Sequence, residues 1–329
     1  NLYVNQYTAA TKTWTSTSPE GRISTNLLDD KGRLIEASVN NLSPTNFIYN
    51  AEGRVSNITQ GSGVDRRETT LTYYNSGTQQ GFLESITDAT NRETSFSYDN
   101  AGRLLTQTLP NGNDINFNYD ANGNIIAITP ANNETHSFDY TKVDKASDYT
   151  PPTVVDITQP STQYSYNLDK QLELISLSDG QEVDHVYHTI KGHKVQTKIP
   201  RGNFDFAYNA TTGQIEQVTS PDGGKVAFTY DGSLVLSTQL TGAVSGKVNQ
   251  VYNNDFQVIQ RCVNTSDCID FNYDNDLLLT QAGSLTINRA AQKGGLITGT
   301  SLGNVSTSNT YNNFGEPLSL STNDSDVYS

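Results

Sequence analysis

Apolar and polar residues alternate with a period of two in short segments along the whole chain. In the segments 115–119 and 226–230, for example, every second residue is apolar and the residues between are polar or small. This alternation is typical of a β-strand that buries one face. We find no stretch with the 3.6-residue period of an amphipathic helix. The pattern therefore predicts an all-β protein built from many short strands.

Most of these segments end in a tyrosine that is followed by Asp or Asn, and the tyrosines recur at a nearly constant spacing. Tyr98 and Tyr119 are 21 residues apart, Tyr74 with Asn75 precedes Tyr98 by 24, and most other steps are similar. The longest step, from Tyr273 to Tyr311, contains Arg289, which we expect to replace one repeat tyrosine. The positions that we assign to the repeat are Tyr49, Tyr98, Asp99, Gly102, Tyr119, Asp120, Gly123, Tyr208, Tyr230, Tyr273 and Tyr311. A short period that covers nearly the whole chain indicates a repeat architecture.

Each unit contains two signals for turns. Asp at the first position and Gly at the fourth, as in Asp99–Gly102 and Asp120–Gly123, favour a type I turn followed by a left-handed glycine that forms a β-bulge. Pro110–Gly112 has the Pro-x-Gly pattern of a second turn, which occurs again at 200–202 and 221–223. One unit of about 21 residues is therefore predicted to be a β-hairpin.

About fourteen such hairpins in series predict a long antiparallel sheet. A sheet of this length twists and does not remain flat. Hydrophobic residues make up only 34% of the chain, which suits an architecture with a thin core and a large surface. We expect the regularly spaced tyrosines to form that core. A β-propeller is the alternative, because two units of about 42 residues approach the length of one blade.

The repeats resemble a known family. The run Tyr98–Leu105, with Pro110–Gly112 and Phe117–Asn124, resembles the YD repeat of the Rhs proteins, of the C-subunits of bacterial Tc toxin complexes and of the teneurins. The segment 276–316 is similar to a stretch found in bacterial members. The resemblance implies a spiralling β-sheet that closes as a hollow shell around a C-terminal polypeptide, commonly a toxin. Some members carry an Asp-Pro-x-Gly self-cleavage motif, which is absent from this sequence, where Pro221 precedes Asp222.

From this resemblance we expect a structural shell segment of a bacterial protein that is secreted or lies at the cell surface. It would enclose or present a toxin or effector polypeptide. Its other partner would be the remainder of its own longer chain or a companion shell subunit. The alternatives are a cell-surface adhesion module that binds carbohydrate and, less favoured, an enzyme that acts on polysaccharides.

The charge of the chain excludes two classes of partner. The formal net charge is −14. An acidic chain of this kind is not expected to bind nucleic acid or an anionic membrane. No apolar run approaches the roughly 18 residues that would indicate a membrane span.

Few residues point to a specific chemistry. Cys262 and Cys268 lie near a predicted turn, and facing positions of an antiparallel pair are close enough for a disulfide, which would indicate an oxidising compartment. Two reduced thiols are the alternative. The cluster His185, His188 and His193 suggests zinc, but His188 occupies the position that Asp fills in other units.

The acidic corners Asp120–Asn124 and Asn323–Asp326 suggest calcium, yet they lack the spacing of a calcium-binding loop, and their turn role explains the same residues. We find no nucleophile elbow, phosphate-binding loop or His-Glu-x-x-His motif. The sequence therefore predicts no catalytic residues, no metal, no cofactor and no enzymatic activity.

The repeat spans 1–329 as one continuous region. The first residue is Asn1 and the chain contains no methionine, so we expect a fragment of a longer chain. The ends, 1–19 and 322–329, do not resemble the strong caps that a repeat array needs, and we expect them to be irregular.

Overall fold

The structure is a computed structural model, and it describes residues 2–131, 134–152, 161–323 and 326–328. Within these ranges the chain forms 31 β-strands and two short 3₁₀ helices, η1 (Gly63–Asp65) and η2 (Lys293–Gly295). The strands of the first half are β1 (Val4–Thr8), β2 (Thr13–Thr17), β3 (Ile23–Leu28), β4 (Leu34–Val39), β5 (Thr45–Tyr49), β6 (Val55–Gln60), β7 (Arg67–Tyr73), β8 (Leu83–Thr87), β9 (Glu93–Tyr98), β10 (Leu104–Thr108), β11 (Asp114–Tyr119), β12 (Ile125–Thr129), β13 (His136–Tyr140), β14 (Ala146–Thr150) and β15 (Thr162–Tyr166). Those of the second half are β16 (Leu172–Ser176), β17 (Glu182–Tyr187), β18 (Lys194–Ile199), β19 (Gly202–Tyr208), β20 (Ile215–Thr219), β21 (Lys225–Asp231), β22 (Leu234–Thr241), β23 (Gly246–Tyr252), β24 (Val258–Val263), β25 (Asp267–Tyr273), β26 (Leu279–Ala282), β27 (Leu285–Arg289), β28 (Ile297–Leu302), β29 (Val305–Tyr311), β30 (Pro317–Thr322) and β31 (Asp326–Tyr328).

Each strand pairs antiparallel with the next strand of the chain, so the whole sheet is a meander of hairpins. The β11–β12 pair illustrates the register, with Asn116 opposite Thr129 and a shift of register at Tyr119. This shift is the β-bulge that the left-handed glycine of the following turn produces, and Gly123 has a φ of 94°. The same shift recurs at the last strand residue of most units.

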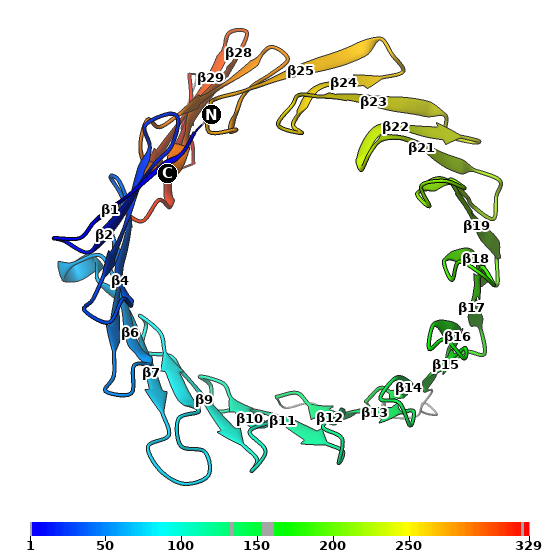
Figure 1. Cartoon of the computed structure of the whole chain (residues 1–329), viewed down its shortest axis with the longest axis horizontal. Helices are drawn as coiled ribbons and strands as arrows, with labels where there is room; N and C mark the ends of the chain where they lie inside the picture. The colour runs from blue at the N-terminus through cyan, green and yellow to red at the C-terminus, as the bar shows by residue number, and fades with distance from the viewer. Residues whose placement is uncertain (1, 132–133, 153–160, 324–325, 329) are drawn as a thin grey trace.

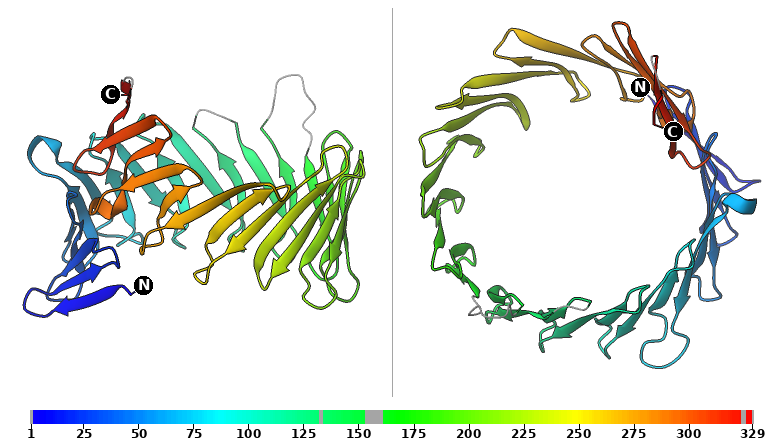
Figure 2. Two further views of the ribbon diagram at one scale, coloured as in Figure 1. Left: turned by 90° about the horizontal axis from the view of Figure 1, so that it is seen from above. Right: turned by 180° about the vertical axis from the view of Figure 1, so that it is seen from behind.

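The meander curves into a ring (Figure 1). Seen from the side, the ribbon rises as it goes round, and its first and last strands lie at different heights (Figure 2). The sheet is therefore a spiral with overlapping ends. No described strand joins β1 to β31, so strand pairing does not close the ring.

The wall of the ring is one sheet thick. Its accessible surface is 20374 Å², whereas a compact monomer of the same mass would expose about 13,000 Å². Among the described residues, Cys262 is the one buried hydrophobic side chain, and the buried polar side chains are Thr59, Ser85 and Ser237. Because no second layer covers the sheet, most apolar side chains are half-buried.

The structure confirms the predicted all-β class and the spiral of antiparallel hairpins. The β-propeller alternative is not supported, since the described strands form one continuous ribbon. The predicted irregular start differs from the structure, because β1 and β2 lie within 1–19. At the other end, residues 324–325 and 329 lie outside the described residues, and β31 lies between them. In the described part of the chain no helix has the length and apolar character needed to cross a membrane.

Candidate functional site: the repeat contacts and the seam of the spiral

The tyrosine at the end of a repeat strand donates a hydrogen bond to the main chain of the preceding strand. The hydroxyl of Tyr119, which ends β11, lies 2.8 Å from the carbonyl oxygen of Leu104, which begins β10. This contact ties the side chain of most units to the unit before it, and Tyr98 is not among the tyrosines that make it. In the described part of the chain eleven tyrosines make it, at 2.6–2.9 Å: Tyr49, Tyr73, Tyr119, Tyr140, Tyr166, Tyr187, Tyr208, Tyr230, Tyr252, Tyr273 and Tyr311.

These tyrosines are half-buried rather than enclosed in a dry core as expected. The physical reason is the single-sheet wall, which covers one side of each ring only. Burial still raises the pKa of Tyr119 and of Tyr208. Tyr98 lies against two other rings, with its centroid 5.1 Å from that of Phe82 and 6.5 Å from that of Tyr74.

One repeat tyrosine was misplaced by a residue. The sequence suggested Tyr74, which precedes Asn75, but Tyr73 ends β7 and donates to the carbonyl of Val55. The hydroxyl of Tyr74 donates to the carbonyl of Phe96 in β9 instead. The nine-residue connection from Tyr74 to Phe82 between β7 and β8 is longer than the usual turn, which is why the Tyr-Asn pair misled the assignment.

Arg289 fills the position of a repeat tyrosine, as predicted. Its Nε donates to the carbonyl of Leu279 at 2.8 Å, and its Nη1 donates to the carbonyl of Gly295 at 2.9 Å. Leu279 begins β26, just as Leu104 begins β10. A guanidinium therefore supplies the donor that a phenol supplies elsewhere.

The Asp side chains of the turns hold the main chain of the same turn. Oδ1 of Asp99 accepts from the backbone N–H of Ala101 at 2.8 Å and of Arg103 at 2.9 Å. Oδ1 of Asp120 accepts in the same way from Asn122 and Asn124. The backbone hydrogen bond from Arg103 is the largest cause that lowers the pKa of Asp99. These carboxylates are thus engaged in local structure.

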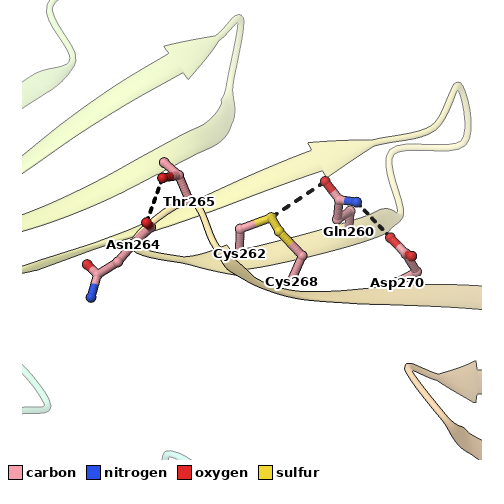
Figure 3. Close-up of a disulfide and its surroundings, with 6 residues drawn as sticks. All are labelled: Gln260, Cys262, Asn264, Thr265, Cys268 and Asp270. Carbon is pink, nitrogen blue, oxygen red and sulfur yellow. Dashed lines mark hydrogen bonds between the residues drawn. A yellow bond between two sulfur atoms is a disulfide. The ribbon is translucent and has the colours of Figure 1, made fainter.

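Cys262 and Cys268 are joined by a disulfide across the β24–β25 hairpin (Figure 3). The two residues are direct register partners, and their Cα atoms are 4.0 Å apart. Two register pairs further along the hairpin, the side-chain amide of Gln260 donates to Asp270 at 2.8 Å. The bridge therefore staples the end of this hairpin.

Two of the three histidines lie together, with the ring centroids of His188 and His193 5.2 Å apart, but among the described residues they form no group of three metal-ligating side chains. Nδ1 of His188 lies 3.2 Å from the backbone nitrogens of Ile190 and Lys191 and accepts from both, which is the role that Asp has in other turns. His185 on β17 bonds to the hydroxyl of Thr197 instead. The ring of His193 packs at 4.0 Å on Tyr208, and burial is the first cause that lowers its pKa.

The carboxylates of the first acidic corner are occupied by amides. Nδ2 of Asn124 donates both to Asp120, at 2.9 Å, and to Asp144, at 2.8 Å. Asp324 and Ser325, within the second corner, lie outside the described residues. Across the residues that the structure describes, no group of three or more His, Cys, Asp or Glu side chains is arranged to hold a metal ion.

The main feature that sequence analysis missed is a seam where the two ends of the spiral overlap. Arg22, between β2 and β3, forms ion pairs with Asp274 and Asp276, which lie in the turn after β25. The side chain of Arg22 is only 11% exposed and that of Asp276 only 5%. Ser18 Oγ also donates to Asp276, at 2.6 Å. These groups form a buried charged cluster between residues about 250 apart in the sequence.

The seam includes two further sets of contacts. The Gln292 side chain donates to the carbonyl of Gly21 and accepts from the backbone N–H of Ile23. At its far end Arg67 forms a two-point ion pair with Glu316, with both N–O distances 2.7 Å. The Arg67 guanidinium also lies 3.9 Å from the centroid of the Phe314 ring. The seam therefore fixes one turn of the spiral against the next.

Comparison with known families agrees with this geometry. The sequence model of the teneurin YD-shell family matches residues 1–326. The chain belongs to this family. The resemblance to YD-repeat proteins that the sequence suggested is confirmed.

Solved structures share the fold of this teneurin YD-shell chain. The crystal structure of TcdB2-TccC3-TEV is similar with a TM-score of 0.63 and 11% identity, over 95% of this chain and 22% of the other. The crystal structure of TcdB2-TccC3 without its hypervariable C-terminal region is similar with a TM-score of 0.62 and 12% identity, over 94% of this chain and 20% of the other. This chain thus spans about a fifth of the length of those chains. The curated proteins include no match.

Membership of the teneurin YD-shell family fits a structural role and a non-catalytic chain. The tyrosines, turn acids and seam residues all serve the wall itself. The histidines and the acidic corners, which could have indicated a metal site, make hydrogen bonds and ring contacts within the same wall.

Proposed function

We propose that this chain is a section of a hollow YD-repeat shell that encloses another polypeptide. The observation that carries the proposal is the seam, where Arg22 is buried against Asp274 and Asp276. A spiral held turn against turn surrounds the space inside it, whereas an open ribbon leaves that space accessible. The shell acts by exclusion, since a polypeptide inside it is hidden from proteases and from the cell.

The enclosed partner in this proposal is a toxin or effector polypeptide of a bacterial Rhs-type protein. Its other partner is the remainder of a longer chain or a companion shell subunit. The fold neighbours support this choice, because both are TcdB2-TccC3 complexes. The Cys262–Cys268 disulfide supports a secreted or cell-surface location, because such bonds persist in oxidising compartments.

The glycan-binding alternative is less well supported. Stacking on sugars would need exposed aromatic faces, but the repeat tyrosines are half-buried and their hydroxyls are used by main-chain carbonyls. An enzyme on polysaccharides is also less well supported, because the carboxylates of Asp99 and Asp120 accept hydrogen bonds within their own turns and that of Asp276 forms the seam. We therefore retain the enclosing shell as the function.

A protection assay tests this proposal. An unfolded passenger is fused after residue 329, and its half-life under a protease is compared with that of the same passenger added as a separate molecule. Enclosure predicts at least a tenfold longer half-life for the fused passenger, and loss of this protection in Arg22→Ala. Equal half-lives for the fused and separate passengers would contradict the proposal.

A further inference from the structure

The turn between β17 and β18 is held by a histidine where other turns have Asp or Asn. Nδ1 of His188 accepts hydrogen bonds from the backbone N–H groups of Ile190 and Lys191, each at 3.2 Å. The turn between β19 and β20 has the same form, since Oδ1 of Asn209 accepts from the N–H groups two and three residues later, both at 2.9 Å. In each turn a glycine N–H also donates to the carbonyl of the first residue at 2.9 Å. His188 and Asn209 therefore hold two turns of the same kind.

Only the neutral form of His188 can hold this turn. A backbone N–H can donate but cannot accept, so the ring nitrogen that faces Ile190 and Lys191 must carry a lone pair, and the proton of the neutral ring is then on Nε2. Histidines take up a second proton between about pH 8 and 5. That proton goes to Nδ1 and removes the lone pair, so both hydrogen bonds are lost. The amide of Asn209 has no such proton to gain.

The other three of the four histidines do not depend on the neutral form in this way. Nδ1 of His136 lies 2.8 Å from a tyrosine hydroxyl, and Nδ1 of His185 lies 3.1 Å from a threonine hydroxyl. A hydroxyl can donate or accept, so these bonds can persist after protonation. The ring of His193 has no hydrogen-bond partner among the described residues. His188 is thus the histidine whose contacts require a neutral ring.

No direct partner stabilises a positive charge at this turn. Lys191 lies in the turn itself, and the ring centroid of His193 is 5.2 Å from that of His188. Burial is the first cause that lowers the pKa of His193, and the charges of His188 and Lys191 lower it further. The other titratable groups at this end of the neighbouring elements are Asp169, Lys170, Glu173, Lys194, Tyr208 and Glu216. In the part of the chain that the structure describes, none of them forms an ion pair or hydrogen bond with either imidazole.

This turn connects the two tyrosine turns on either side of it. The side-chain amide of Gln171 donates to the carbonyl of Gly192 at 2.6 Å. On the other side, Nζ of Lys191 donates to the carbonyl of Ala210 at 3.4 Å. β17 and β18 lie across the ring from β1 and β2 (Figure 1). A change in this turn therefore alters the wall at a point remote from the seam.

We propose that the turn 188–193 is a pH-sensitive point in the wall of the spiral. With a neutral His188 the turn is closed and ties the turns on both sides of it, and with a protonated His188 it loosens and frees them. The contribution of His188 is complete at neutral pH and is lost as the pH falls below about 6.5, the ordinary value for histidine. The seam pair of Glu316 weakens only below pH 4.5, so this turn responds first. The switch belongs to the wall and is independent of any enclosed polypeptide.

Amide hydrogen exchange of the whole chain tests this proposal. A protection factor compares the exchange rate of an amide with that of an unfolded chain at the same pH. For the amides of His188 and Gly192 it should fall roughly 5- to 100-fold between about pH 7.5 and 5.5, as expected for the loss of two hydrogen bonds. The internal control is Gly213, which donates to Asn209 in the matching turn and should keep its protection. An equal fall at Gly192 and Gly213, or no fall at Gly192, overturns the proposal.

His188→Asn assigns the response to a single residue. The variant reproduces the side chain of Asn209, so it should keep the protection of Gly192 at both pH values. His193→Phe keeps an aromatic ring beside Tyr208 and should retain the fall. A fall that persists in His188→Asn, or that disappears in His193→Phe, overturns the assignment to His188.

Nitrogen-15 NMR of the unmodified chain provides a measurement that needs no variant. Nδ1 of His188 should carry no proton at pH 7.5 and should gain one over the same pH range in which the protection of Gly192 falls. A neutral ring with its proton on Nδ1 overturns the proposal, as does a loss of protection while the ring is still neutral.

Discussion

Arg22 and Asp274 are 252 residues apart in the sequence, yet Nη2 of the arginine lies 2.8 Å from Oδ2 of the aspartate. At about 21 residues a unit, one turn of the spiral takes about twelve units. The contact joins the loop between β2 and β3 to the turn after β25, so the overlap of the ends has a fixed register. The stability of the ring as a closed object depends on this seam.

Arg22→Ala should open the seam. Removing one partner of a buried ion pair leaves Asp274 and Asp276 uncompensated and costs about 3 kcal/mol. Amide hydrogen exchange should detect the opening of the seam at Glu20 and Asn275, whose backbone N–H groups donate across the seam. These amides should exchange faster in the variant, whereas amides in β11 and β12 should not change.

Arg92→Ala is the matched control for that variant. Arg92 pairs with Asp88 within a single turn and is 69% exposed, so its removal should cost less than about 1 kcal/mol and leave the seam amides protected. If Arg22→Ala and Arg92→Ala have the same effect at Glu20 and Asn275, the seam does not hold the turns together.

Acid should weaken the seam between pH 4.5 and about 2. The hydrogen bond from Arg67 is the largest cause that lowers the pKa of Glu316 from 4.5 to about 2. A depressed folded pKa means that the contribution is complete above the unfolded pKa and is lost as the pH falls through the folded value. The thermal midpoint should therefore fall over this range.

Glu316→Gln isolates this contribution. At neutral pH the variant should have a lower thermal midpoint than the unmodified chain. On acidification the midpoint of the variant should fall less. The pKa of Asp276 contributes in the same direction: burial alone would raise it, but hydrogen bonds from Ser18, Glu20 and Arg22 lower it. An acid profile identical to that of the unmodified chain would show that Glu316 makes no pH-dependent contribution.

Loss of the Cys262–Cys268 bridge should have a small and local effect. The bridge spans six residues of sequence, and a loop this short restrains the unfolded chain by about 2 kcal/mol at most. Calorimetry with and without a reductant measures this value. The reductant should have no effect on the double variant Cys262→Ala/Cys268→Ala, and a loss of the whole fold on reduction would contradict a local role.

Arg289→Tyr should be tolerated, because a phenol serves the same position in eleven other units. Arg289→Ala leaves the carbonyls of Leu279 and Gly295 without their charged donor and should cost about 2 kcal/mol. Chemical denaturation of the two variants measures their free energies of unfolding. Equal losses in both would show that the position is not equivalent to that of the repeat tyrosines.

Local features of the fold were predictable from local sequence. Alternation before Tyr119 predicted β11, and Asp120 with Gly123 predicted the turn and bulge that follow. These features depend on residues within one unit, so the sequence of one unit is enough to predict them. Tyr73 shows the limit, because a longer connection after β7 shifted the apparent Tyr-Asn signal by one residue.

The seam could not be predicted in this way. Arg33 pairs with Asp29 inside one turn, whereas the same position before Arg22 is Ser18, which carries no charge. The local sequence therefore shows that Arg22 lacks a partner in its own turn, but it does not show which distant carboxylates Arg22 meets. The partners of Arg22 depend on how far each hairpin rotates and rises relative to the last. Small increments of twist add up over about twelve units before two turns meet.

The sequence by itself determined the hairpin, because strand alternation, the repeat tyrosines and turn glycines act over a few residues. It did not decide between one continuous ribbon and the blades of a propeller, because the same repeated hairpin can build either. Only the tertiary structure decided that Arg22 meets Asp274 and that Arg67 meets Glu316. The reason is that curvature is a sum over the whole spiral, and no single segment contains that sum.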